Sequence, residues 1–309
     1  MQFYTFIINP AAGNGHVKHI WPQLEKYLET HNINYAVQTT KYPGHASQIV
    51  QELAILNPQP IMVVLGGDGT LHEALNGLQT KNLQATLAYI PCGSGNDFAR
   101  GANIDFGPLK ALQKIITNPT YQDIDIGFYH DAIRNNSAFF TNNLGIGFDA
   151  NIVYLANHSY SKRLLNKHQL GFLAYAFSFF KAYFRQKTFN LTLTCQDTTY
   201  TFQKAFLCTI TNHPYFGGGV CLMPKAKLND GKLDVVIIEK KSTLHFWYLF
   251  LLMILPGHLH SLSKKVHHFQ ASSIRLETPA CNHCHADGED LTCAPSDLTF
   301  TIKKQHFII

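Results

Sequence analysis

The sequence lacks the features that mark several common classes of protein. No apolar run reaches the roughly 20 residues that a membrane-spanning helix needs, so we expect no transmembrane segment. Its 25 lysines and arginines are scattered rather than clustered, and the net charge of +5 is small for a nucleic-acid-binding protein. Internal repeats and low-complexity linkers are also missing. We therefore expect a globular chain with no nucleic-acid partner, whose mildly basic surface suits phosphate ligands or anionic lipid.

The cysteines do not form the pattern of a disulfide framework. They number seven, they have no regular spacing, and the chain does not begin with a basic segment and a long apolar leader. This predicts a cytoplasmic protein with reduced thiols. Zinc binding is an alternative for the cluster of Cys281, His283, Cys284, His285 and Cys293. We disfavour zinc because the cluster straddles an expected strand and turn, and because no second C-x₂-C pair exists.

A glycine-rich turn after an apolar strand is the strongest local signal. Ile61 to Leu65 is an apolar run, three glycines surround Asp68, and Thr70 opens a helix-like spacing of apolar residues. Glycine at 66, 67 and 69 would allow positive φ and bring backbone N–H groups close to phosphates. The helix start adds free N–H donors and a positive dipole end. Because a carboxylate beside phosphates repels them unless Mg²⁺ or a lysine intervenes, Asp68 indicates a metal–nucleotide site, the alternative being a plain strand-to-helix turn.

Two more polar loops follow strands that are expected in the same sheet. Asn9 to Gly15 follows the first strand, and Pro91 to Arg100, which contains Asn96 and Asp97, follows the fourth. Strands alternate with helix-spaced segments in this part of the chain, which predicts a parallel sheet covered by helices. Ligands of such sheets bind at the carboxyl ends of the strands, where Thr40 also lies.

The pattern changes after about Asp123, and the chain length supports a second domain. Short alternating runs predict an antiparallel sandwich-like domain; they are Ile124–Phe128, Ala138–Asn142, Phe189–Cys195, Tyr200–Thr211 and Leu233–Ile238. Two helical stretches rich in aromatic residues interrupt these runs, Leu170 to Phe184 and Leu244 to Leu262, the second broken by Pro256-Gly257. We expect both to be buried or to line a cleft, with a position on a membrane interface as the alternative.

With these motifs in place, the chain resembles the diacylglycerol kinase family of bacterial soluble lipid kinases, within a larger group that includes sphingosine kinases and NAD kinases. The matching segments occur in the family's order: Asn9–Gly13, Gly66–Glu73, Pro91–Arg100, Asn229–Asp234 and Asp287–Glu289. Gly-Gly-Asp-Gly-Thr alone is shared with NAD kinases, whereas the third segment points to lipid kinases. The resemblance implies an α/β ATP-binding domain, residues 1–125 with a returning strand at 296–309, and a β-sandwich lipid domain, residues 126–295.

The resemblance also implies roles for individual residues. The positions that match ATP-contacting ones are Asn9, Pro10, Ala11, Ala12, Gly13, Thr40, Gly66, Gly67, Asp68, Gly69, Thr70, Leu71, His72, Ser94, Asn96 and Asp97. His72 stands where the family usually has asparagine. Asp68 and Asp125 match a carboxylate network around catalytic Mg²⁺, and Asp287 with Glu289 matches the region that supplies the general base.

A further turn matches a second, structural Mg²⁺ site in the family. Its residues are Lys227, Asp230 and Lys232, and the two lysines would contribute main-chain carbonyls. Judged from the residues alone, an Asp-Gly hairpin is the more natural interpretation of this turn.

The expected activity is transfer of the γ-phosphate of ATP to the hydroxyl of diacylglycerol, which yields phosphatidic acid at the inner membrane face. Phosphoryl transfer needs positioning, Mg²⁺ and one carboxylate near the attacking hydroxyl. The alternatives are another lipid alcohol, a sphingoid base or NAD as acceptor, and a non-catalytic lipid or nucleotide sensor. Retention of Asp68, Asp125 and Asp287 argues against a sensor. The oligomeric state, including a homodimer, stays open.

Overall fold

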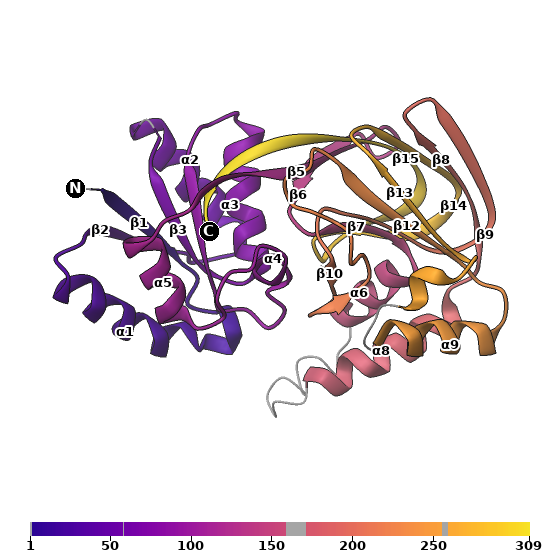
Figure 1. Cartoon of the computed structure of the whole chain (residues 1–309), viewed down its shortest axis with the longest axis horizontal. Coiled ribbons are helices and arrows are strands. Elements are labelled where there is room, and N and C mark those ends of the chain that lie inside the picture. The colour runs from indigo at the N-terminus through magenta and orange to yellow at the C-terminus, as the bar shows by residue number, and fades with distance from the viewer. Residues whose placement is uncertain (1, 58, 159–170, 255–258) are drawn as a thin grey trace.

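The computed structural model describes residues 2–57, 59–158, 171–254 and 259–309. The N-terminal half, indigo to purple, and the C-terminal half, pink to yellow, lie next to each other (Figure 1). Most strands belong to one hydrogen-bonded path in the order β13-β12-β9-β7-β14-β15-β4-β3-β1-β2. Within the described ranges, no helix is both long enough and apolar enough to cross a membrane.

The N-terminal half is a parallel sheet packed with helices. Its elements are β1 Phe3–Ile8, η1 Ala12–Gly15, α1 Val17–Thr30, β2 Asn34–Thr39, α2 His45–Leu56, β3 Ile61–Gly66, α3 Asp68–Thr80, β4 Thr86–Pro91, α4 Asp97–Gly101 and α5 Pro108–Thr117. β1, β3 and β4 are almost entirely buried, as apolar central strands of a parallel sheet should be, whereas β2 at the edge is largely exposed. The predicted α/β domain is confirmed.

The C-terminal half is an antiparallel β structure with helices on one side. Its elements are β5 Tyr121–Asp131, β6 Asn136–Phe140, β7 Asn143–Gly147, α6 Phe148–His158, α8 Gly171–Arg185, β8 Phe189–Cys195, β9 Thr198–Thr211, β10 Tyr215–Phe216, β11 Val220–Cys221, β12 Leu233–Glu239, α9 Thr243–Ile254, η2 Leu259–Leu262, β13 Val266–Ala271, β14 Ile274–Ala286 and β15 Glu289–Ile308. The predicted run over Ala138–Asn142 was wrong as a single strand, because the chain leaves β6 after Phe140 and enters β7 at Asn143. Leu170 and Pro256-Gly257, which were part of the predicted helices, lie outside the described residues.

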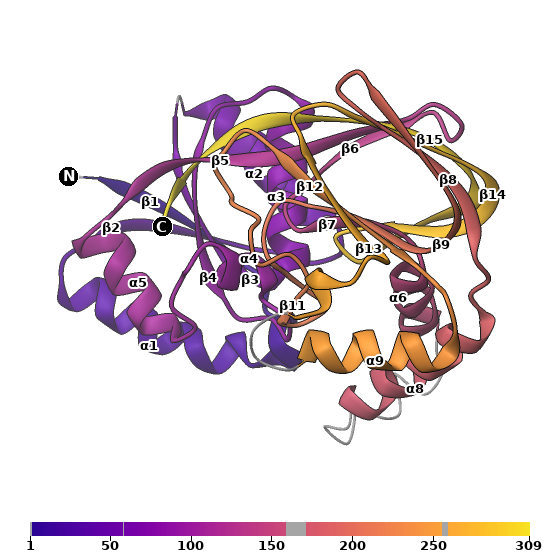
Figure 2. The same cartoon turned by 45° about the vertical axis from the view of Figure 1, so that its right-hand side comes forward.

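Two long strands join the halves. β5 and β15 pair along most of their length, and the end of β15 lies parallel to β4, with Phe307 opposite Leu87. Figure 2 shows both strands arching together from the sandwich to the parallel sheet. The domain borders predicted at 125 and 296 therefore fall inside β5 and β15, so each of these strands serves both halves.

The helices of the C-terminal half form an aromatic layer beside β9. Phe148 of α6 stacks on Phe206 with ring centroids 5.0 Å apart, and Phe246 of α9 meets both rings edge-on. Phe179 of α8 contacts the same cluster through Phe148. These contacts bury one face of α8 and α9, and they bring both helices to the wall of the cavity described below.

Candidate active site

Three loops meet at the edge where β1, β3 and β4 end. The backbone N–H of Asn9 donates to Leu65 O at 3.0 Å, and that of Cys92 donates to Gly66 O at 2.7 Å. The Asn9 side chain reaches α3, where Nδ2 donates to Thr70 Oγ1 at 2.9 Å. The structure thus brings together the three motifs that the sequence placed at the carboxyl ends of parallel strands.

Glycine serves close packing rather than positive φ in the loops that follow β3 and β4. Gly67 is extended, with φ −99° and ψ −179°, and Gly66 and Gly69 also lack a positive φ. A Cβ on Gly66 would lie 2.6 Å from Thr70 Oγ1, and a Cβ on Gly93 would lie 2.6 Å from Gly67 Cα. The prediction of positive φ at 66, 67 and 69 was therefore wrong, because here two loops pack backbone against backbone.

The remaining positions predicted to contact ATP lie along the same edge but differ in backbone conformation, hydrogen bonding and burial. Gly13 has φ +58°, and a Cβ there would lie 2.4 Å from Cys92 O. Thr40 extends the ladder by donating its N–H to Ile8 O at 2.8 Å. Asn96 closes its own loop, accepting from Gly93 N and donating to Gly93 O, both at 2.9 Å. Leu71 is fully buried, so only its backbone faces the loop.

Two aspartates face each other below these loops. Asp68 accepts hydrogen bonds from the N–H groups of Asp97 at 3.1 Å and Phe98 at 3.3 Å, so it caps the start of α4. Burial, with the negative charge of Asp97, raises the pKa of Asp68 to about 6. Burial also raises the pKa of Asp97, although Gly218 N donates to its Oδ2 at 2.8 Å. Two buried carboxylates that each disfavour ionisation of the other make a site for a cation.

The residues present fit Mg²⁺. Asp97 Oδ1 is buried and has no hydrogen-bond partner in the described part of the chain, which leaves a carboxylate oxygen free beside Asp68. Among the described residues no group of three or more His, Cys, Asp or Glu forms a complete metal centre. Mg²⁺ often binds through one or two carboxylates together with substrate phosphates, and Asp68 with Asp97 would supply such a partial set.

Asp287 lies in a pocket of hydrogen-bond donors. Its Oδ2 accepts from Thr141 N at 2.8 Å and Thr141 Oγ1 at 3.0 Å, and its Oδ1 accepts from Asn142 N at 2.9 Å and Asn143 N at 3.0 Å. His72 Nδ1 lies 2.8 Å from Oδ2. Burial alone would raise the pKa of Asp287, but His72 and the backbone donors outweigh burial and lower it. These bonds fix the carboxylate as an anion between β6 and β7.

His72 connects the two halves of the protein. It lies in the first turns of α3, directly after the glycine loop, yet its ring reaches the β14–β15 turn at Asp287. Burial lowers its pKa, but the hydrogen bond and charge of Asp287 outweigh burial, so the pKa is raised overall. Asn76, one turn further along α3, donates to Phe139 O at 2.9 Å. Glu289, the other predicted base candidate, is exposed.

Asp125 belongs to a different place from Asp68. Its Oδ2 accepts from Gly231 N at 2.6 Å, and Lys304 Nζ lies 3.9 Å from its Oδ1. Asp230 Oδ1 accepts from Lys232 N at 3.1 Å in the same turn. Asp125 and Asp68 were predicted to share one carboxylate network. In the described residues the two side chains are not in contact. Asp125 Oδ1 is buried without a hydrogen-bond partner there, so this carboxylate fits the second turn instead.

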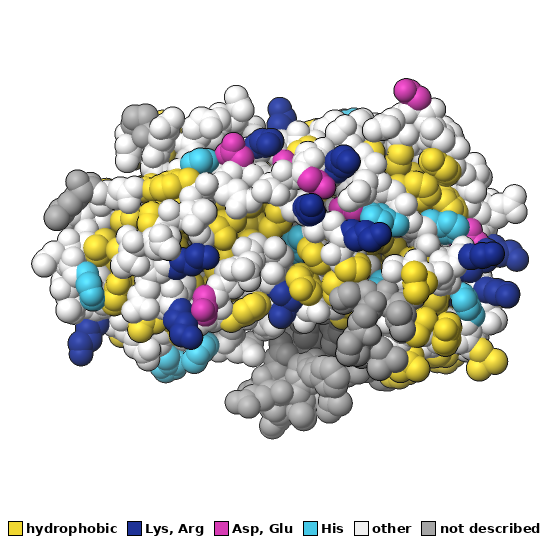
Figure 3. Space-filling model, viewed as in Figure 1, with side chains coloured by type: hydrophobic (Ala, Val, Ile, Leu, Met, Phe, Trp, Pro, Cys, Tyr) yellow, Lys and Arg dark blue, Asp and Glu magenta, His cyan; other side chains and the backbone are white. Residues whose placement is uncertain are grey.

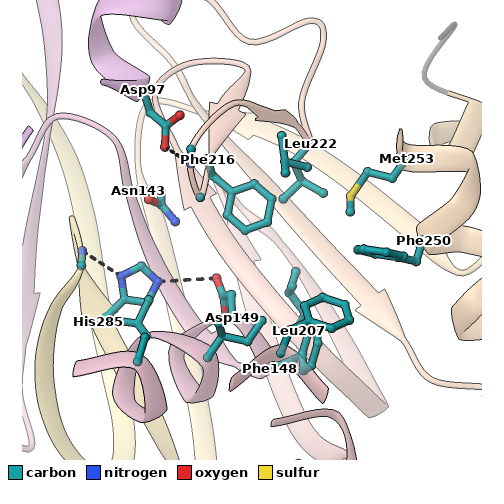
Figure 4. Close-up of a pocket in the computed structure, with 18 of the residues that line it drawn as sticks. Asp97, Asn143, Phe148, Asp149, Leu207, Phe216, Leu222, Phe250, Met253 and His285 are labelled. Carbon is teal, nitrogen blue, oxygen red and sulfur yellow. Dashed lines mark hydrogen bonds and ion pairs between the residues drawn. The ribbon is translucent and has the colours of Figure 1, made fainter. Parts of the chain in front are cut away.

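A cavity of about 830 Å³ opens from the carboxylates into the C-terminal half. Figure 4 shows Asp97, Asn143, Asp149 and His285 toward one end, and apolar side chains such as Phe250 toward the other. The apolar walls come from α6, α8, α9, β9 and the β10–β11 region. Ser94, Asp68 and Asp287 also line the cavity, so the glycine-rich loops and the apolar space share one enclosure.

Sequence reasoning missed the groups that hold the aspartates. Thr141 to Asn143 supply four of the bonds to Asp287, and the Gly217–Gly219 loop holds Asp97. His213 is fully buried, its Nε2 lies 2.7 Å from Asn142 Oδ1, and burial lowers its pKa to about 4. A signal for the first group was present, because Thr-Asn-Asn interrupts two apolar runs without a glycine or proline to explain a turn.

The histidines and cysteines before Asp287 have other partners in the structure. His283 stacks on Tyr154, with ring centroids 4.2 Å apart. Cys284 is buried in the sandwich core, and His285 faces Asp149 at 3.7 Å. The cluster therefore has its side chains on opposite faces of β14, as alternation along a strand requires.

Comparison with known proteins agrees with these two halves. Residues 4–129 match the model of the diacylglycerol kinase catalytic domain, and residues 142–304 match that of the YegS C-terminal NAD kinase beta sandwich-like domain. The chain is 31% identical over 300 residues to "Putative lipid kinase YtlR" of Bacillus subtilis (strain 168), which covers 96% of each chain. It is 25% identical to "Diacylglycerol kinase" of the same organism, covering 100% of this chain and 97% of the relative.

A solved structure has the same fold. The crystal structure of a diacylglycerol kinase from Bacillus anthracis str. Sterne superposes with a TM-score of 0.72 at 22% identity, covering 99% of this chain and 96% of the other. The family models and the 31% identical relative confirm the resemblance that the sequence motifs indicated. The chain belongs to the diacylglycerol kinase-like family of lipid kinases.

Proposed function

We propose that the protein transfers the γ-phosphate of ATP to the hydroxyl of diacylglycerol in a Mg²⁺-dependent reaction that yields phosphatidic acid. The observation that carries the proposal is the cavity of about 830 Å³, which joins carboxylates at one end to an apolar space at the other. A polar acceptor such as a nucleoside would not need this apolar space. A lipid alcohol places its hydroxyl at the polar end and its chains in the remainder.

The N-terminal loops supply the nucleotide half of the site. The start of α3 presents unpaired N–H groups and a positive dipole end, which favour phosphate. A Cβ on Gly69 would meet no atom within 4 Å, so the backbone is open there to a ligand. We assign ATP to this edge, from the Asn9–Gly13 loop to Ser94.

The carboxylates divide into two roles. Asp68 and Asp97 would hold Mg²⁺, which neutralises charge on the transferring phosphoryl group. Asp287, fixed by His72 and the backbone donors, orients the acceptor hydroxyl and accepts its proton. Its lowered pKa makes it a weak base, which suffices because the hydroxyl becomes acidic only late in a loose phosphoryl transfer.

The second turn would hold a structural cation. Asp125 Oδ1 lacks a hydrogen-bond partner within the described chain. The other oxygen, Oδ2, accepts a hydrogen bond from the backbone N–H of Gly231, which belongs to the turn from Lys227 to Lys232. We propose that Mg²⁺ bound here stabilises this turn and the start of β12, and that it takes no part in the reaction.

The apolar faces of α8 and α9 that point away from the cavity suit a membrane surface. Phe184 and Leu244 are 79% and 84% exposed, and Lys181, Arg185 and Lys241 are exposed beside them. Figure 3 shows hydrophobic side chains gathered at the lower right, where α9 lies in Figure 1. Apolar and basic groups together favour an anionic bilayer, from which diacylglycerol would enter the cavity.

The test is turnover with purified protein, Mg²⁺-ATP and a panel of dispersed acceptors. Diacylglycerol should be converted to phosphatidic acid, whereas NAD should give no NADP. Faster turnover of a sphingoid base or another lipid alcohol would change the assigned acceptor. Absence of turnover on every long-chain alcohol would contradict the proposal and favour a non-catalytic sensor.

A further inference from the structure

The polar end of the cavity presents a side-chain donor that no protein group uses. Asn143 is only 6% exposed, and its Nδ2 has no hydrogen-bond partner in the part of the chain that the structure describes. Its backbone N–H donates to Asp287 Oδ1 at 3.0 Å. The unused amide group therefore belongs to a residue whose backbone already binds Asp287, the carboxylate that would receive the acceptor hydroxyl. A buried donor without an acceptor is costly, so a ligand atom is the natural partner.

A second donor lines the cavity from β14. Gly288 N–H donates to His285 Nδ1 at 3.2 Å, so the neutral ring carries its proton on Nε2. Nε2 lies 3.7 Å from Asp149 Oδ2, which is too long for a hydrogen bond. In Figure 4, the His285 ring lies between the β14–β15 turn and Asp149, on the same side of the cavity as Asn143.

The neighbouring carboxylate already accepts a hydrogen bond on each of its oxygens. Asp149 Oδ2 accepts from Thr209 Oγ1 at 2.6 Å, and its Oδ1 accepts from Ala150 N at 2.9 Å. Gly145 leaves the space for this arrangement, because a Cβ there would lie 2.1 Å from Asp149 Oδ2 and 2.6 Å from His285 Nε2. Within the described chain, Asn143 Nδ2 is therefore a buried donor without an acceptor, and His285 Nε2 has only the longer contact with Asp149, so a ligand acceptor would pair with both.

We propose that Asn143 Nδ2 and His285 Nε2 bind an ester carbonyl of the acceptor lipid and so select glycerides. The inference rests on the proposed kinase function and names the chemical class that the same site takes. In 1,2-diacylglycerol, an ester is attached to the carbon next to the one that carries the hydroxyl. A hydroxyl at Asp287 thus brings that carbonyl to the donor of the adjoining Asn143 side chain.

Other lipid alcohols fit this wall less well. An ether lipid has the hydroxyl and the chains but lacks the carbonyl. A sphingoid base brings an ammonium group, which donates hydrogen bonds and accepts none. The ether oxygen is a weaker acceptor than a carbonyl, and the ammonium group occupies the position of the ester, so either ligand pairs with these donors less well and should bind about 10-fold or more weakly.

The test compares binding of 1,2-dioctanoylglycerol, 1,2-di-O-octylglycerol and sphingosine to the full-length protein without ATP. Trp247 lines the cavity, whereas the other tryptophan, Trp21, lies in the N-terminal core, so intrinsic fluorescence reports occupancy. The ester lipid should bind about 10-fold tighter than the ether lipid. In Asn143→Leu, and separately in His285→Phe, this ratio should fall toward one while affinity for the ether lipid is kept.

Leu222→Ala is the matched control, because this residue lines the apolar part of the cavity and should weaken both glycerolipids equally. Equal binding of ester and ether lipids by the wild type would overturn the inference, as would tightest binding of sphingosine, no binding of any of the three, or an unchanged ratio in both donor variants. Ester selectivity without phosphate transfer would instead sink the proposed function alone. Turnover of diacylglycerol without ester selectivity would sink this inference alone.

Discussion

Asp68→Asn should stabilise the protein while it removes activity. Burial and the charge of Asp97 raise the pKa of Asp68 to about 6, against an ordinary value of 3.8. The unfolded chain therefore ionises this group more readily than the folded protein does. The loss of folding stability appears as the pH rises above the pKa of the unfolded state, and it is complete once the pH exceeds the pKa of the folded state. Without Mg²⁺, the native carboxylate is a source of instability at neutral pH.

The size of the effect follows from the two pKa values. Ionising Asp68 in the folded protein costs about 3 kcal/mol at pH 8, and about 1 kcal/mol at pH 4.5. Asparagine avoids that cost and its Oδ1 can still accept one of the two bonds, but its Nδ2 cannot accept the other, from Asp97 N or Phe98 N, which costs about 1 to 2 kcal/mol. Asp68→Asn should thus gain about 1 to 2 kcal/mol at pH 8 and lose that advantage at pH 4.5.

Urea unfolding of both proteins in metal-free buffer, at several values of pH, measures this difference. Asp287→Asn is the control of opposite sign, because His72 and backbone donors lower the pKa of Asp287. A lowered folded pKa stabilises above pH 3.8, so this variant should be less stable across the whole window. A pH-independent gain in Asp68→Asn, or a loss at pH 8, would refute the reasoning.

Three other variants test separate parts of the account. Asp287→Asn should abolish turnover while ATP affinity, measured by titration calorimetry, stays within about twofold, because the donors to ATP lie on other loops; unchanged turnover would move the base elsewhere. Phe184→Ser combined with Leu244→Ser should weaken sedimentation with anionic vesicles by about 10-fold or more and leave turnover in detergent micelles unchanged, and equal losses in both assays would contradict a membrane role for this face. Gly13→Ala should lower the free energy of unfolding by at least about 1 kcal/mol, because of its positive φ and the nearby Cys92 carbonyl, and a neutral result in urea unfolding would show that the loops can move apart.

Local pattern was sufficient to predict the parallel half of the fold. Apolar strands, polar loops and helix spacing recur there within short windows, and the first half needs no distant information to be recognised. The split between β6 and β7 was not predicted, because the bend at Thr141–Asn142 is stabilised by Asp287, far away in the sequence. Neither glycine nor proline marks this bend.

The site was predicted in its parts but not in its connections. Asp68 and Asp97 were singled out from their loops and Asp287 from the family resemblance, yet the donors that set their pKa values come from other segments, among them His72 and Gly218. The charge environment of a carboxylate depends on such tertiary neighbours, which spacing along the chain does not reveal. Asp125 shows the same limit, since its Oδ2 accepts from Gly231 N, a contact that spacing along the chain does not reveal.

The most direct test of the central claim is label transfer from γ-labelled ATP to dispersed 1,2-diacylglycerol by the purified protein with Mg²⁺. The account predicts labelled phosphatidic acid with the wild type and none with Asp68→Ala or when Mg²⁺ is chelated. Label that never reaches a lipid with the wild type, or that reaches lipid equally with Asp68→Ala, would contradict it.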